Sequence, residues 1–149
     1  MISKPVLREL VTHRLRDAEA LFAKKRYRGA IYMSGYAIEI ALKYKICKLY
    51  LFSKGFPENK VEFQSYYNVT GIKKQLRQTI KSVQEIKNHD LSKLLFYSGS
   101  ELRVKSKTLI EWHLIATWNP EMRYANTLIR KSEAQNKLSA VKSLLKEIL

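Results

Sequence analysis

The chain has 149 residues, enough for a single domain with a full hydrophobic core. Its one cysteine, Cys47, excludes an intrachain disulfide framework, and no uninterrupted apolar segment approaches the roughly 18 residues of a membrane span. The 28 Lys and Arg residues against 13 Asp and Glu give a formal charge of +15, which attracts polyanions, nucleic acid first among them. The lysines are dispersed over the whole chain, however, so they can equally form a solvated surface.

The composition favours an all-α fold, because glycine and proline are scarce and Ala, Leu, Ile, Lys and Glu are abundant. We expect one domain over residues 1–149, an up-and-down bundle of four to five helices. The first ten residues lack the apolar core of a signal peptide, so a cytosolic protein without membrane contact is expected.

The first helix is predicted to begin at Ser3 and Pro5, with serine as the cap and proline in the first turn. Its apolar positions recur at spacings of three and four along one face: Leu7, Val11, Leu15, Ala18 and Phe22. The short basic segment 24–28 should then turn the chain, so that this helix lies antiparallel to the next one.

The stretch from Tyr27 to Leu49 is apolar almost all round and is therefore expected to be the central helix of the bundle. Glu39 lies in its middle, with Lys43 four residues later. The ordinary explanation is an intrahelical ion pair, and the functional one is a polar patch that fixes a ligand or partner. Cys47, on the same helix, is expected to be a buried structural thiol.

Residues 53–60 collect Gly, Pro and Asn and are expected to form a loop, and the wider segment 53–71 is expected to be a loop or an insertion. A helix should resume at Ile72 and bury Leu76, Ile80, Val83 and Ile86. Residues 88–90 should then stop it and start a short helix that Gly99 closes.

A fourth long helix is predicted from Glu101 to Trp118, with four residues facing inward: Leu102, Leu109, Trp112 and Ala116. Asn119 and Pro120 should end it. The final helix is expected to open at Ser132 with a capping box and to bury one stripe of residues: Ala134, Leu138, Val141, Leu145 and Ile148.

The order of the segments KRYRGAIYMSGYAIEIALK, NHDLSKLL and WNPEMRY, followed by the terminal helix, resembles HEPN domains. These are helical bundles of prokaryotic toxin and antiphage systems, often found beside minimal nucleotidyltransferases. The resemblance covers roughly residues 15–149, with 53–71 unmatched. It implies a homodimer that binds nucleic acid or nucleotides and a possible nucleotidyltransferase partner.

Many HEPN domains are metal-independent ribonucleases in which an arginine is followed four to six residues later by a histidine near the start of the last long helix. This chain has no histidine from Leu128 onward, so that catalytic position is empty. A similar spacing occurs at Arg8 and His13, in the first helix. This pair is a catalytic candidate, and a solvated basic face is the competing explanation.

Four further positions are candidate ligand-binding residues. His89 and Asp90 begin a helix after a break, where Asp90 is expected to act as the N-cap. In WNPEMRY, Arg123 is a candidate to bind a phosphate and Tyr124 to stack on a base, although both can also serve the fold. No metal site is expected, because His113 has no second ligand nearby in sequence and no cofactor motif is present.

Two functions from different classes follow. The first is a non-catalytic HEPN-like module that binds a nucleic acid, a nucleotide or a nucleotidyltransferase-type partner in a defence or toxin–antitoxin setting. The second is a metal-independent ribonuclease toxin with a non-standard site, formed by Arg8 and His13 or by histidines brought together in a dimer. A scaffold without nucleic-acid affinity is a third possibility, and it predicts binding that does not respond to salt.

Overall fold

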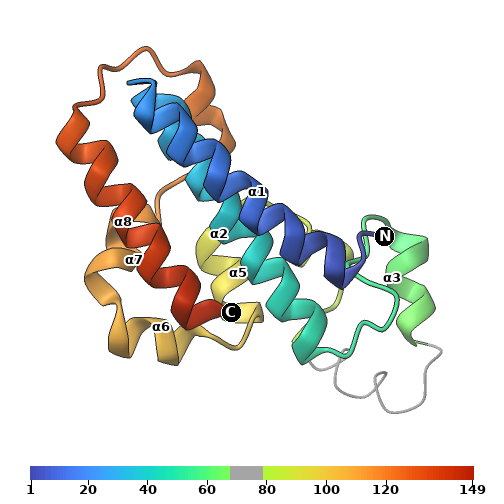
Figure 1. Ribbon diagram of the computed structural model, residues 1–149. Helices are drawn as coiled ribbons and strands as arrows, with labels where there is room; N and C mark the ends of the chain where they lie inside the picture. Colours follow the sequence, from blue (N-terminus) through green and yellow to red (C-terminus); the bar gives the residue numbers. More distant parts are fainter. Residues whose placement is uncertain (68–78) are drawn as a thin grey trace.

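The computed structural model describes residues 1–67 and 79–149, and these residues are organised as an all-α bundle (Figure 1). The described α-helices are α1 (Lys4–Ala23), α2 (Tyr27–Leu49), α3 (Lys60–Tyr67), α5 (Leu91–Tyr97), α6 (Glu101–Lys107), α7 (Leu109–Ile115) and α8 (Lys131–Ile148). Two 3₁₀ helices accompany them, η1 (Val83–Glu85) and η2 (Pro120–Tyr124). The all-α prediction is confirmed, with more short helices than expected.

The first two helices form an antiparallel pair (Figure 1). Pro5 lies in the first turn of α1 as predicted, but the side chain of Ser3 forms no capping hydrogen bond. Lys25 reverses the chain in a left-handed conformation, with φ of 59°, and the amide of Arg26 donates to the carbonyl of Leu21 at 2.8 Å. The turn therefore returns α2 along α1.

The prediction that residues 27–49 form the central helix is confirmed. α2 packs against α1, α5, η2 and α8, and eleven of its residues are buried. Cys47 is one of them, and burial raises the pKa of its thiol to about 12, which keeps it protonated. No helix within residues 1–67 and 79–149 is long and apolar enough to cross a membrane.

α8 packs against α2 and α7. All five residues of the stripe predicted for this helix are buried: Ala134, Leu138, Val141, Leu145 and Ile148. The prediction of a capping box at Ser132 is wrong, because the helix already begins at Lys131. Arg130 occupies the cap position and its side chain makes no capping bond.

The single long helix predicted from Glu101 to Trp118 is also wrong. The backbone breaks at Thr108, with φ of −140° and ψ of 41°, and the Oγ1 of Thr108 donates to the carbonyl of Val104 at 2.9 Å. The break rotates α7 relative to α6. As a result Leu102 is 83% exposed and Leu109 is also exposed, although both were expected to face inward. Trp112 is buried as predicted.

Residues 80–90, the described stretch before α5, pack on the core without forming an α-helix. Ile72 and Leu76 lie outside the described residues. Ile80, Val83 and Ile86 are buried as expected, but only the short η1 forms there. Earlier, α3 and the loop before it bury three aromatic side chains: Phe56, Phe63 and Tyr66. The 53–67 part of the expected loop or insertion is thus packed on the domain.

Candidate ligand-binding site

The site is built around Glu39, a buried carboxylate in the middle of the central helix. Its side chain is 4% exposed, and each of its oxygens has a partner. The Nζ of Lys43, one turn later, lies 2.6 Å from Oε1, and the Nδ1 of His89 lies 2.8 Å from Oε2. A buried charge of this kind persists only when it is paired and hydrogen-bonded, which the two contacts provide.

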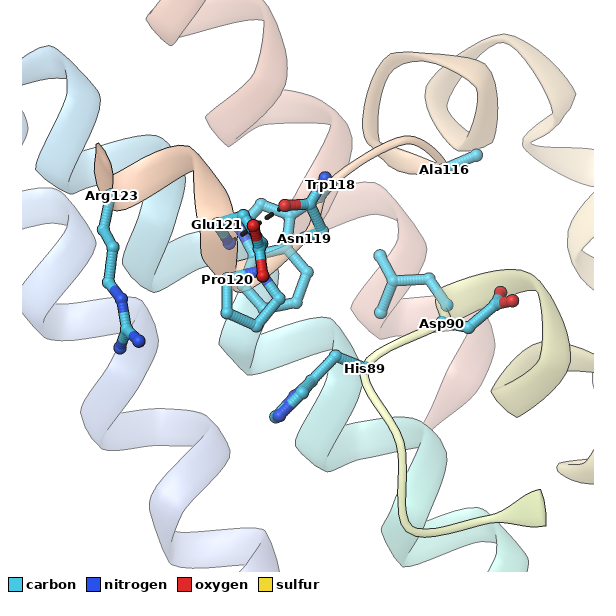
Figure 2. A pocket seen from close by; sticks show the side chains of 9 residues that line it. His89, Asp90, Ala116, Trp118, Asn119, Pro120, Glu121 and Arg123 are labelled. Atoms are coloured by element: carbon cyan, nitrogen blue, oxygen red, sulfur yellow. Dashed lines mark hydrogen bonds between the residues drawn. The ribbon is translucent and has the colours of Figure 1, made fainter. Parts of the chain in front are cut away.

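His89 reaches Glu39 because the residues on either side of it are fixed. The carboxylate of Asp90 accepts a hydrogen bond from the amide of Lys93 at 3.0 Å and so caps α5, as predicted. The amide of Asp90 donates in turn to the side-chain oxygen of Asn88 at 2.9 Å. Figure 2 shows the side chains of His89 and Asp90 leaving this segment in opposite directions.

The contact with Glu39 also selects a tautomer for His89. An ionised carboxylate can only accept hydrogen bonds, so Nδ1 carries the proton when the imidazole is neutral. Nε2 is then the acceptor, on a side chain that is 55% exposed.

The two turns of α2 that precede Glu39 carry tyrosine rings, which lie near His89 and Trp118. The ring of Tyr36 meets those of His89 and Trp118 edge-on, with centroids 6.3 Å and 4.9 Å away. The Oη atoms of Tyr36 and Tyr32 are 3.4 Å apart. Burial raises the pKa of Tyr36 to about 12, with smaller contributions from Tyr32 and Glu39, so Tyr36 is a neutral phenol at neutral pH.

Gly35 lets Trp118 approach the central helix. A Cβ at this position would lie 2.2 Å from the Nε1 of Trp118, a distance that no real side chain tolerates. Nε1 is buried and has no hydrogen-bond partner among the described residues. Since an unpaired buried donor costs free energy, the packing of the indole on α2 must offset that cost.

η2 brings Arg123 to the other side of the site. The helix is capped by Asn119, whose side-chain oxygen accepts from the amide of Glu121 at 2.9 Å. Hydrogen bonding with Tyr32, followed by the electrostatic effect of Tyr124, raises the pKa of Arg123 above its ordinary value. The guanidinium carbon lies 4.6 Å from the centroid of the exposed Tyr124 ring.

Together these elements line a cavity of about 510 Å³. Its walls come from the residues around His89, the end of α7 and η2 (Figure 2): His89, Asp90, Leu91, Ala116, Trp118, Asn119, Pro120, Glu121 and Arg123. The guanidinium of Arg123 supplies a fixed positive charge and several donors, and Nε2 of His89 supplies a titratable acceptor. A small polar ligand that carries an anionic group fits such a lining, because the carboxylate of Asp90 is already engaged in capping.

Of the predicted residues, His89, Asp90 and Arg123 line the cavity. Glu39 contacts His89 and pairs with Lys43, but neither Glu39 nor Lys43 lines the cavity. Tyr124 lies beside Arg123 but does not line the cavity. Arg8 and His13 are elsewhere: both are exposed on α1, where Nε2 of His13 is 3.7 Å from Glu9. Within the described ranges no three His, Cys, Asp or Glu side chains come close enough to hold a metal ion.

Sequence reasoning missed Trp118 and treated Tyr36 only as core. The available signal was Gly35, a glycine inside an otherwise strong helix pattern, which often marks a close approach by another group. Nothing in the sequence identifies Trp118 as that group, because the contact spans more than eighty residues.

Comparison of the chain with models of known protein families, with curated proteins and with solved structures finds no match.

Proposed function

We propose that this chain is a non-catalytic, HEPN-like binding module that engages a nucleic acid or a nucleotide in a defence or toxin–antitoxin setting. The observation that carries the proposal is the cavity between His89 and Arg123, in a domain of charge +15. His89 and Arg123, from different elements, both line it together with Trp118.

The ligand class follows from the chemistry of these groups. A guanidinium binds a phosphate with two parallel hydrogen bonds, and the exposed Tyr124 beside it offers a face on which a base can stack. The net charge adds a long-range attraction for a polyanion. Glu121 also lines the cavity, so a ligand with hydrogen-bond donors as well as phosphate oxygens suits it better than a simple anion.

The test is equilibrium binding of a fluorescently labelled single-stranded RNA of twelve nucleotides by the wild type and by Arg123→Met. We expect the variant to bind about tenfold more weakly and to lose about 0.7 from the slope of log affinity against log salt, the value for one phosphate contact. Arg16→Met is the control, because Arg16 is an exposed arginine on α1 outside the site. Equal losses in the two variants would reduce the binding to general charge attraction.

A nucleotidyltransferase-type partner and a homodimer complete the proposal. Both rest on the resemblance in sequence. Sedimentation equilibrium of the purified protein tests the second of these: a mass of twice 17.5 kDa supports a homodimer, and a mass of 17.5 kDa overturns it.

One observation favours ribonuclease activity as a second candidate function, namely the pairing of His89 with the buried Glu39. A carboxylate that fixes Nδ1 and leaves Nε2 available is the arrangement that positions a histidine as a general base. In this scheme Nε2 removes the proton of a ribose 2′-hydroxyl. The 2′-oxygen then bonds to phosphorus and the bond to the 5′-oxygen breaks, leaving a 2′,3′-cyclic phosphate and, once protonated, a 5′-hydroxyl.

Metal-free incubation with end-labelled RNA separates the two candidates. Intact RNA supports the binding module. Cleavage that disappears in His89→Ala but persists in His13→Ala establishes the second candidate at this site. Cleavage that disappears in His13→Ala instead moves the chemistry to α1.

A further inference from the structure

A second pocket lies on another side of the central helix. It has a volume of about 330 Å³ and is formed by the last turns of α2, the turn between α5 and α6, and the first turn of α6. Its lining contains three cations and no carboxylate: Lys45, Lys48, Leu49, Ser98, Gly99, Ser100 and Arg103. At 100° per residue, Lys45 and Lys48 point away from the face of α2 that carries Glu39 and Lys43. We call it the cationic pocket.

Among the described residues, Arg103 is the one cation of the three with an ion pair, and Nζ of Lys48 lies 5.7 Å from the ring centroid of Tyr44. Arg103 is paired with Glu147 at 3.0 Å, and Glu147 also contacts Lys107. Lys45 has no ion pair or hydrogen bond with any residue that the structure describes. Partial burial, and then the charges of Lys48 and Arg103, lower the pKa of Lys45. The surroundings therefore disfavour the charge on Lys45. An anion bound between these side chains would reduce the repulsion between their charges.

The turn supplies shape but few free donors. Gly99 adopts a φ of 68°, which favours glycine, and its amide donates to the carbonyl of Phe96. The amide of Ser100 donates to Oγ of Ser98, and that hydroxyl donates to the carbonyl of Leu95. The amides of Gly99 and Ser100 and the hydroxyl of Ser98 are therefore already hydrogen-bonded. An anion in this pocket must be held chiefly by the three long cationic side chains. Such side chains suit a tetrahedral oxyanion that can accept several hydrogen bonds at once.

We propose that the cationic pocket binds a phosphate group, carried by inorganic phosphate or by a small phosphate monoester, between Lys45, Lys48 and Arg103. This site does not rest on the proposed function, because it shares no lining residue with the cavity at His89 and Arg123.

The test is calorimetric titration of the purified protein with inorganic phosphate, and separately with adenosine 5′-monophosphate, at constant ionic strength. We expect saturable binding that Lys45→Met weakens at least about tenfold. Lys93→Met is the matched control, since Lys93 is an exposed lysine on α5 outside both pockets, and it should leave the affinity unchanged. Arg103→Met provides a second variant with the expected loss, in case Lys45→Met perturbs the fold.

The two ligands identify the source of the phosphate. Tighter binding of the monophosphate indicates a monoester, and equal binding indicates that the phosphate alone is recognised. Absence of saturable binding by either ligand overturns the proposal. So does an affinity that depends on Arg123 and not on Lys45, because the phosphate would then bind at the first cavity, a result that supports the proposed function.

Discussion

The Oε2 atom of Glu39 lies 2.8 Å from the Nδ1 of His89, fifty residues further along the chain. This contact joins the central helix to the segment that starts α5 and fixes one wall of the candidate site. Because Glu39 is buried and also pairs with Lys43, the contact bears on stability as well as on the geometry of the candidate site.

Replacement Glu39→Gln should destabilise the protein by about 3 kcal/mol, because it leaves the mostly buried Lys43 without its anion. Urea unfolding followed by circular dichroism measures the loss. Glu19→Gln is the control: Glu19 also pairs with a lysine, Lys142, at 2.6 Å, but both side chains are more than 40% exposed. It should cost less than about 1 kcal/mol. Equal losses would mean that burial adds nothing to the Glu39 pair.

Stability should fall as pH rises from 10 to 12, in part through Tyr36. The unfolded chain releases the phenol proton near the ordinary pKa of 10.0, whereas the folded protein holds it to about 12. Below pH 10 both states keep the proton, so nothing is lost. Between these values only the unfolded state loses it, which favours unfolding by up to about 2 kcal/mol.

Unfolding measured at several pH values in Tyr36→Phe tests this. The variant should lose less stability over that interval than the wild type, whereas Tyr124→Phe, which removes an exposed phenol, should behave like the wild type. If the stability of Tyr36→Phe fell with pH as steeply as that of the wild type, the pKa of Tyr36 would not be raised in the folded protein.

Gly35→Ala should destabilise the protein by about 2 kcal/mol or more. The added methyl meets the indole of Trp118 at 2.2 Å, so the ring must move off the helix. Gly29→Ala is a matched helical control, because its methyl would meet only the flexible side chain of Leu21 at 3.2 Å. There the gain in helix propensity should offset the contact. If Gly35→Ala is as stable as Gly29→Ala, Trp118 is not held where the structure places it.

The features of this fold that depend on neighbouring residues in sequence could be predicted from local patterns. The stripe of α8 and the cap at Asp90 depend on residues within one or two turns, and both are confirmed. The prediction that Leu102 faces inward was wrong because the break at Thr108 changes the helical phase. A single β-branched residue in the sequence does not predict such a break.

The candidate site shows the same division. Glu39 and Lys43 are one turn apart, so their pairing could be anticipated from spacing. Their meeting with His89, and the seating of Trp118 on Gly35, depend on the path of the chain between distant helices. A single sequence carries no local signal of that path.

Trp118 can report RNA binding at the cavity directly in Trp112→Phe, a variant that leaves Trp118 as the only tryptophan. The measurement is its fluorescence during titration with the twelve-nucleotide RNA. If the RNA binds in the cavity, we expect a saturable change in emission, with the same midpoint as binding measured by anisotropy, and a midpoint about tenfold weaker when Arg123→Met is added. Binding by anisotropy without any change in Trp118 emission would contradict binding in the cavity, as would the absence of binding.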